Sequence, residues 1–359
     1  MKLLDRYVLR EFLGYLVLGL SGFIVIFIVV DIFEKIAVFL DHHASADMIA
    51  RFYLYRAPEV VVQVLPVALL LATFLALGQL NKFGELTAMR ASGLSLIRIL
   101  TPVLAAAAAA SAGALLLSEL VVPRANHERD TIYEEQIQSL RREAVSERPD
   151  LTYIGSGGRI YYARLYLVRE QRMQDVSLQE FAGDSLARRI DAAEATWDGT
   201  QWVFASGIER SFSGDHETAR PFTRMVIKGL KERPADFTKE NRTPAEMNYF
   251  ELRTFVDRLR ASGGIVSKYL VDLHLKLAFP LVNFIVVVIG ASLATQLRLH
   301  SAAVGFGLSV AISFLYYAFM RTGQALGHTG ALPPYAAAWI GNAVFGVVAL
   351  VMLYRAQSR

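Results

Sequence analysis

Long apolar segments occur in two groups along the chain, one near each end. An α-helix needs about 20 mainly apolar residues to cross the hydrocarbon core of a bilayer. Six segments reach that length, at residues 12–40, 53–80, 96–122, 269–295, 302–323 and 334–354. The pattern predicts a membrane α-helical protein built from two halves of three transmembrane helices, at residues 1–122 and 266–359.

The residues between the two halves, 123–265, have a different periodicity. Residues 123–142 are polar and helix-forming, and from Leu151 onward short runs alternate between apolar and polar positions. Turn sequences separate these runs, and the segment from Trp197 to Trp202 is typical of a β-hairpin with two facing aromatic rings. At least six strands result, which predicts an antiparallel sandwich or an all-β jelly-roll-like domain. An amphipathic helix is expected after it, at 249–261.

Composition agrees with a membrane protein and locates its charge. Of the 359 residues, 54% are hydrophobic, and the mean hydropathy is +0.35. The net charge is +4, yet residues 121–268 hold 23 basic and 23 acidic side chains, so the whole surplus lies in the apolar halves. A nucleic-acid-binding protein concentrates positive charge on its soluble surface, which argues against that class here. The chain has no cysteine, which excludes disulfides and thiolate metal sites.

The basic residues that flank the apolar segments fall on alternate connections. They lie at the two chain ends and in the connections that follow the second and fourth segments: Lys2, Arg6, Arg10, Lys82, Arg90, Arg98, Arg298, Arg355 and Arg359. Cytoplasmic loops of membrane proteins carry an excess of Lys and Arg. We therefore expect both termini in the cytoplasm, and the domain at 123–265 on the exterior side of the inner membrane.

The cytoplasmic connection at 82–95 is predicted to contain a short amphipathic helix bounded by glycines. Leu86, Met89 and Arg90 follow one another at helical spacing. Glu85 lies in the first turn, where the helix dipole favours a negative charge, and it can accept a bidentate arginine. Such a helix suits the docking of a soluble partner. The alternative is an ordinary connector in which Glu85 merely starts the helix.

Charged residues at the exterior ends of the predicted helices are candidates for contact with a lipid headgroup, because charges within spans are costly and often functional. These residues are Asp31, Lys35, Arg124, Arg129 and Arg321. The arginines suggest a basic ring that suits an anionic headgroup. The alternatives are that each arginine is an interfacial anchor, and that Asp31 pairs with Lys35 four residues on at the headgroup boundary.

Motifs for catalysis are missing from the sequence. There is no G-x-x-x-x-G-K-[ST] loop for nucleotide phosphates, no H-E-x-x-H metal motif and no G-x-S-x-G nucleophile motif. We therefore predict no catalytic residue, no metal site and no cofactor.

Local motifs are spread over the whole chain. They are Asp5-Arg6-Tyr7; Pro58-Glu59; Leu65-Pro66; Glu85-Leu86-Thr87-Ala88-Met89-Arg90-Ala91-Ser92-Gly93; Glu119-Leu120-Val121-Val122-Pro123 with Asn126; Glu251-Leu252; and Leu259-Arg260-Ala261-Ser262-Gly263. Together with the order of three spans, a β-domain and three spans, they resemble the LptF/LptG family, the permease subunits of the lipopolysaccharide export ABC transporter. Leu332-Pro333-Pro334 before the last span, and the end at Arg359, are more similar to the G-type subunit.

The resemblance implies a non-catalytic permease that extracts lipopolysaccharide from the inner membrane. It would pair with an LptF-type permease and receive a cytoplasmic LptB-type ATPase dimer at Glu85, Leu86, Met89 and Arg90. Its periplasmic domain would pass the lipid to a single-span LptC-type jelly-roll protein and an LptA-type bridge toward the outer membrane. One departure concerns the first span, where some members carry several lysines at the exterior end. Here Lys35 is the basic residue of that segment, and the arginines named above are candidates to replace the others.

Other functions remain open at this stage. A different lipid-exporting or lipoprotein-exporting ABC permease usually has four spans with its domain after the first, unlike this chain. A membrane receptor or assembly factor that binds a periplasmic ligand would not need the cytoplasmic helix with Glu85. A membrane enzyme acting on a lipid-linked sugar would need catalytic carboxylates or a metal site, and no convincing set is present.

Overall fold

The structure is a computed structural model that describes residues 3–137, 147–155, 159–182, 185–213, 216–227, 229–230, 232–238, 243–261, 266–296 and 302–357. Contacts divide the chain into two compact units. One comprises Met1–Ile132, Pro244–Leu252 and Ser267–Arg359, and the other Tyr133–Thr243 and Arg253–Val266. The first unit contains the apolar helices and the second contains the β-sheet.

Among the described residues, six helices are long and apolar enough to cross a membrane. They are α1 (Leu3–Asp41), α2 (Ala46–Lys82), α4 (Leu96–Leu120), α9 (Ser267–Gln296), α10 (Ala302–His328) and α11 (Pro334–Gln357). The prediction of six transmembrane helices is confirmed. Helices α1 and α2 begin earlier than hydropathy predicted, because their first turns are polar and continue the helix beyond the apolar run.

Helices α2 and α9 form the centre of the helical unit. Leu69, Leu70 and Leu77 of α2 are fully buried, as is Val286 of α9. A Cβ atom at Gly290 of α9 would lie 2.5 Å from Cδ1 of Leu70. The glycine therefore permits the close approach of these two helices, as small residues commonly do between membrane helices.

Polar side chains connect the outer helices to this centre. The Asn342 Nδ2 atom of α11 donates a hydrogen bond to the Ala278 carbonyl oxygen of α9 at 2.7 Å, and the Tyr316 hydroxyl of α10 donates to Asn342. The Tyr317 hydroxyl donates to the Gln63 carbonyl oxygen of α2. Buried polar groups must find protein partners inside a membrane, so these bonds help to set how α10 and α11 pack.

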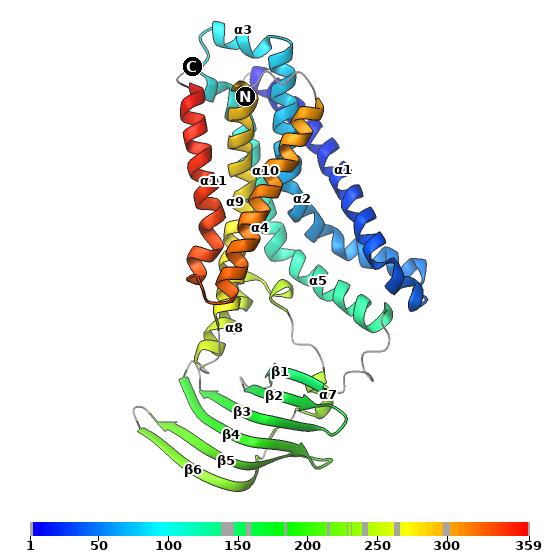
Figure 1. The fold of residues 1–359 in the computed structure, drawn as a ribbon, viewed down its shortest axis with the longest axis vertical. Helices are drawn as coiled ribbons and strands as arrows, with labels where there is room; N and C mark the ends of the chain where they lie inside the picture. The colour runs from blue at the N-terminus through cyan, green and yellow to red at the C-terminus, as the bar shows by residue number, and fades with distance from the viewer. Residues whose placement is uncertain are drawn as a thin grey trace. The chain divides into compact units, whose positions relative to one another are not determined.

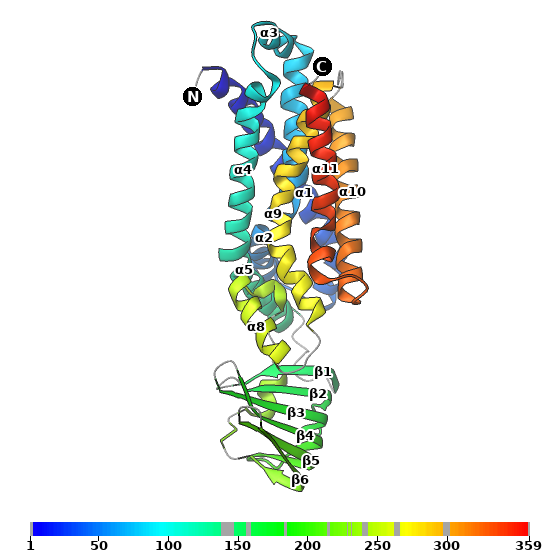
Figure 2. The same ribbon diagram turned by 90° about the vertical axis from the view of Figure 1, so that its left-hand side faces the viewer.

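A short helix, α3 (Glu85–Ala91), lies at the same end of the helical unit as both chain ends (Figures 1 and 2). Gly84 before it and Gly93 after it have φ angles of +73° and +88°, which glycine adopts without steric cost. The predicted short helix in this connection is therefore present. We call this end of the helical unit the α3 end, and the opposite end the outer end.

The second unit contains one antiparallel sheet of six described strands, which runs from β1 to β6 in sequence order (Figure 2). The strands are β1 (Glu147–Ile154), β2 (Ile160–Leu167), β3 (Arg172–Ala182), β4 (Ser185–Trp197), β5 (Trp202–Ser213) and β6 (His216–Val226). The prediction of an inserted antiparallel β-domain is confirmed. The strand order differs from a sandwich or jelly roll, because each strand pairs with the next along the chain through a short hairpin connection, without a crossover.

The predicted aromatic hairpin joins β4 to β5. Trp197 and Trp202 are paired across the two strands, with ring centroids 5.5 Å apart. The Asp198 Oδ1 atom accepts hydrogen bonds from the backbone N–H groups of Thr200 and Gln201, both at 2.8 Å, and Gly199 has a φ angle of +100°. The turn is therefore fixed by the residue types that indicated it in the sequence.

One face of the sheet carries an aromatic core. Trp202, Tyr161 and Tyr166 are buried there and surround Phe237 of the short helix α7 (Pro234–Thr238). The Trp202 Nε1 atom donates to the Glu232 carbonyl oxygen at 3.0 Å. Burial raises the pKa of Tyr166 to about 12, so the ring stays neutral and packs as an apolar group.

The connections around the sheet are also helical. The polar helix predicted at 123–142 is α5 (Val122–Thr131) followed by a π-helical segment, η1 (Ile132–Ile137); its last residues lie outside the described ranges. A 3₁₀ turn, η3 (Pro244–Glu246), precedes α8 (Tyr249–Ala261), which is the predicted amphipathic helix.

Candidate functional site

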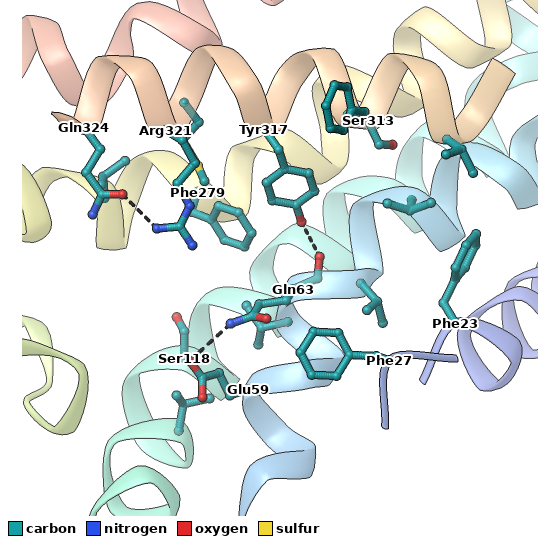
Figure 3. A pocket seen from close by; sticks show the side chains of 18 residues that line it. Phe23, Phe27, Glu59, Gln63, Ser118, Phe279, Ser313, Tyr317, Arg321 and Gln324 are labelled. Atoms are coloured by element: carbon teal, nitrogen blue, oxygen red, sulfur yellow. Dashed lines mark hydrogen bonds between the residues drawn. The ribbon is translucent and has the colours of Figure 1, made fainter. Parts of the chain in front are cut away.

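A cavity of about 670 Å³ opens between the membrane helices of the first unit. Its wall is formed mainly by α2 and α10, with two residues each of α1 and α9 and single residues of α4 and α5: Phe23, Phe27, Glu59, Val62, Gln63, Val64, Val67, Ser118, Val122, Leu275, Phe279, Val310, Ser313, Phe314, Tyr317, Met320, Arg321 and Gln324. Figure 3 shows α10 on one side, with Arg321, Gln324 and Tyr317, and α2 on the other, with Glu59 and Gln63.

The charged residues of the cavity lie near the outer end of their helices. Glu59 precedes the apolar middle of α2, and Arg321 and Gln324 lie in the last turns of α10. Phe23 and Val310 line the part nearer the α3 end. The cavity is therefore amphipathic along the helix axes, with an apolar interior and a charged outer rim. This matches a molecule with apolar chains and a polar head.

Beside the outer rim, Asp31 is buried and collects three donors. Lys35 Nζ donates at 2.7 Å, the Tyr53 hydroxyl at 2.9 Å and Arg56 Nη2 at 3.0 Å. The Asp31 side chain is only 5% exposed, and Arg56 also lies over the Phe27 ring, 5.5 Å from its centroid. The pairing of Asp31 with Lys35 that the sequence suggested is present within α1. The contacts with Tyr53 and Arg56 also join Asp31 of α1 to α2.

A second set of ion pairs continues from α2 to α5. Arg129 Nη1 donates to Glu59, and Arg129 Nε donates to Asp130 at 2.7 Å. Glu59 also lies 3.8 Å from Arg56. Burial lowers the pKa of the Arg129 guanidinium, but Asp130 and Glu59 raise it by more, so the pKa ends above its ordinary value. We call Asp31, Lys35, Arg56, Glu59, Arg129 and Asp130 the ion-pair cluster.

The five headgroup candidates from the sequence do not form one ring. Asp31, Lys35 and Arg129 are brought together, but only through Arg56 and Glu59, which sequence reasoning missed. Charges at 56 and 59 within a predicted span were the signal that could have found them. Arg321 lines the cavity and donates to Gln324 at 2.9 Å, whereas Arg124 is exposed and does not line this cavity. Asp31, Lys35 and Arg129 are thus engaged with protein groups.

The buried position of Asp31 gives a direct prediction for stability. Asp31→Asn removes the negative charge that Lys35 and Arg56 share, and breaking a buried ion pair costs about 3–5 kcal/mol. We therefore expect the solubilised variant to melt at a clearly lower temperature than the unmodified chain. Tryptophan fluorescence measures the melting temperature. Glu34→Gln, at an exposed position of the same helix, is the matched control. Equal melting temperatures for the two variants would show that Asp31 does not hold α1 against α2.

Helix α3 has one packed side and one open side. Leu86 is 4% exposed and joins the core of the helical unit, and Met89 packs against that core. Arg90 is exposed and Glu85 is half-buried. Of the four residues predicted to contact a partner, Leu86 and Met89 thus anchor α3 to its own chain. Glu85 and Arg90 are accessible.

The start of α1 is attached to this region at two points. The Tyr7 hydroxyl donates to Glu85 Oε1 at 3.2 Å, and Arg98 pairs with Asp5 at 2.9 Å just after α3. The Asp5-Arg6-Tyr7 motif therefore joins the start of α1 both to α3 and to the first turn of α4.

The motif at the end of α4 contacts the segment that returns from the β-sheet. Glu119 accepts a hydrogen bond from the Tyr249 backbone N–H and pairs with Lys276 of α9 at 3.8 Å. Asn126 donates to the Ala245 carbonyl oxygen at 3.2 Å, and His127 contacts Glu246 at 2.8 Å. This motif, together with His127, thus contacts the segment Pro244–Leu252, which is distant in the sequence.

Six membrane helices, an inserted antiparallel β-domain and an amphipathic cavity between the spans define a multi-pass membrane protein of the permease class. Residues 6–355 match the family described as lipopolysaccharide export system permease LptF/LptG, and the chain belongs to this family. It is therefore a lipopolysaccharide export permease of the inner membrane that works within a transport system of several proteins. A search of curated protein sequences found no match.

Proposed function

We propose that this chain takes lipopolysaccharide laterally from the outer leaflet of the inner membrane and delivers it toward the outer membrane. The observation that carries the proposal is the cavity, which is apolar along its depth and charged at its outer rim. Acyl chains are accommodated beside Phe23, Val67 and Val310, and the anionic headgroup lies at the rim near Arg321 and the ion-pair cluster. Arg124, which is exposed on α5, is available to the sugar portion.

The chain works as one half of a transporter, as a G-type subunit paired with an LptF-type permease. The two helices that flank the cavity, α1 and α10, expose large apolar side chains such as Val25, Phe33, Phe314 and Phe319. A second permease placed against these faces would complete the cavity wall. Closure of the pair would then push the lipid toward the outer end.

Energy enters through an LptB-type ATPase dimer at α3. This chain has no nucleotide-binding motif, and the accessible Glu85 and Arg90 supply opposite charges for an interface. The α3 end, with both termini, faces the cytoplasm, and the β-sheet lies in the periplasm, as the basic residues of these connections favour. From the β-sheet the lipid passes to an LptC-type single-span protein and an LptA-type bridge.

Site-specific photocrosslinking tests the position of the lipid. A benzophenone side chain in place of Phe314, which lines the cavity, is expected to crosslink lipopolysaccharide in membranes. The same side chain in place of Leu350, which is 67% exposed on α11 and does not line the cavity, should yield little. Equal yields at the two positions would contradict the proposed site, because they would indicate contact with bulk lipid only.

A further inference from the structure

The ion-pair cluster is electrically neutral. It contains three cations, Lys35, Arg56 and Arg129, and three carboxylates, Asp31, Glu59 and Asp130. An anionic ligand that reaches these cations therefore finds each of them already paired. Binding of the ligand requires the displacement of a carboxylate.

Glu59 is the member of the cluster that faces the cavity. It is among the lining residues, whereas Arg56 and Arg129 are not. The Arg56 side chain is 19% exposed and the Arg129 side chain 11% exposed, and both approach the Glu59 carboxylate. The Nε atom of Arg56 is buried without a hydrogen-bond partner among the described residues. A ligand entering from the cavity thus meets Glu59 first and the two guanidinium groups behind it.

We propose that Glu59 is a competing carboxylate that sets a threshold for headgroup binding at this rim, which phosphomonoester headgroups pass and phosphodiester headgroups do not. The proposal rests on the proposed function in one respect, which is that a lipid headgroup reaches the outer rim of the cavity. Gln63 Nε2 donates to Glu59 Oε1 at 3.2 Å, so a neutral partner one turn away remains when Glu59 leaves the arginines. Glu59 then acts as a specificity-determining residue within the wall of the site.

The selectivity follows from charge and hydrogen-bond geometry. A phosphomonoester carries about −1.5 to −2 charges at pH 7 and offers three acceptor oxygens. A phosphodiester carries one charge, so it replaces the Glu59 carboxylate with an anion of the same charge and gains little. Guanidinium groups bind phosphate through paired N–H donors, and the guanidinium groups of Arg56 and Arg129 both approach the same oxygen of Glu59. Only the more highly charged headgroup gains enough to displace this internal anion.

The test compares two lipids that differ only in this feature, dioleoyl phosphatidic acid and dioleoyl phosphatidylglycerol. Each is titrated into nanodiscs that hold the full chain with benzophenone in place of Phe314, and the crosslink yield gives its apparent affinity for the cavity. The wild-type side chain at 59 should give a clear preference for phosphatidic acid. Glu59→Gln should strengthen the binding of both lipids by about tenfold, the effect of one charge-assisted hydrogen bond, because either headgroup displaces the same carboxylate. Phosphatidylglycerol should then occupy the rim at concentrations at which it does not occupy the wild-type chain.

Two further variants separate the competition from net charge and from damage to the fold. Glu128→Gln makes the same charge change at an exposed position next to Arg129, and it should leave both affinities unchanged. Glu59→Asp retains the competing charge and should retain the wild-type affinities.

Three outcomes would overturn the inference. They are unchanged affinities for both lipids in Glu59→Gln, an equal gain of affinity in Glu128→Gln, and a wild-type chain that binds both lipids alike. The proposed function fails separately, by the absence of lipopolysaccharide crosslinks at position 314.

Discussion

Glu85→Ala is expected to abolish transport while the chain remains folded in the membrane. Glu85 is half-buried in the first turn of α3, and its side chain accepts a hydrogen bond from Tyr7. A carboxylate fixed in this way is prepared to accept an arginine from a docked ATPase. Loss of one partner from a desolvated charge pair at an interface costs about 2–5 kcal/mol. The ATPase should therefore be lost on purification, or its hydrolysis should no longer drive lipid release.

Tyr7→Phe provides the matched control for this variant. It removes the hydrogen bond to Glu85 and leaves the carboxylate, so ATPase recovery should stay close to that of the unmodified chain. Glu85→Ala would then differ from it because a partner contact is lost. Normal transport together with a normal yield of ATPase in Glu85→Ala would refute the role of this residue.

Val310→Trp is expected to block lipid uptake. Val310 lines the cavity and its side chain is 41% exposed, so the larger ring enters the cavity and not the packed core. Overfilling a site typically costs about 1–3 kcal/mol, which corresponds to a five- to 150-fold loss of occupancy. Lipopolysaccharide release and lipid-stimulated ATP hydrolysis should fall accordingly. The assay is ATP-dependent release from proteoliposomes.

The control for the cavity variant is Val304→Trp on the same helix. Val304 is 51% exposed and does not line the cavity, so transport should be retained. If both tryptophan variants transport normally, the cavity is not on the lipid path. If both fail, the effect belongs to α10 as a whole and not to its cavity.

The membrane helices could be predicted from sequence because hydropathy measures directly what a bilayer requires. The short helix α3 could also be predicted, since Gly84 and Gly93 adopt the left-handed backbone that bounds it. In the β-domain, residue types at the Trp197–Trp202 hairpin fixed a local turn. The order of strands in the sheet was not accessible in this way, because alternation gives the face of a strand and not its neighbour.

The candidate site was only partly predictable. Asp31 and Lys35 are four residues apart, so their pairing follows from helix geometry. The contact of Asp31 with Arg56 depends on how α1 packs against α2, and that of Glu59 with Arg129 on how α5 leaves α4. Such long-range pairs have no periodic signal in one sequence. For the same reason, the sequence did not reveal that Arg129, a candidate for the basic ring, is paired with the Glu59 carboxylate of another helix.

The role of the α4 motif illustrates the same limit. Glu119 and Asn126 were visible as a motif, but not their contacts with the backbone of Tyr249 and Ala245. Backbone atoms carry no sequence signature, so a side chain that recognises them can be located only after folding.

The function as a lipopolysaccharide export permease is tested most directly by purification of the tagged chain from its native membrane, followed by mass spectrometry of proteins and bound lipid. We expect a second permease of the family, a cytoplasmic ATPase in the same complex, and lipopolysaccharide as the enriched lipid. In Glu85→Ala the ATPase should be depleted while the second permease and the lipid remain. Recovery of the chain without an ATPase and without enrichment of lipopolysaccharide over bulk phospholipid would contradict this function.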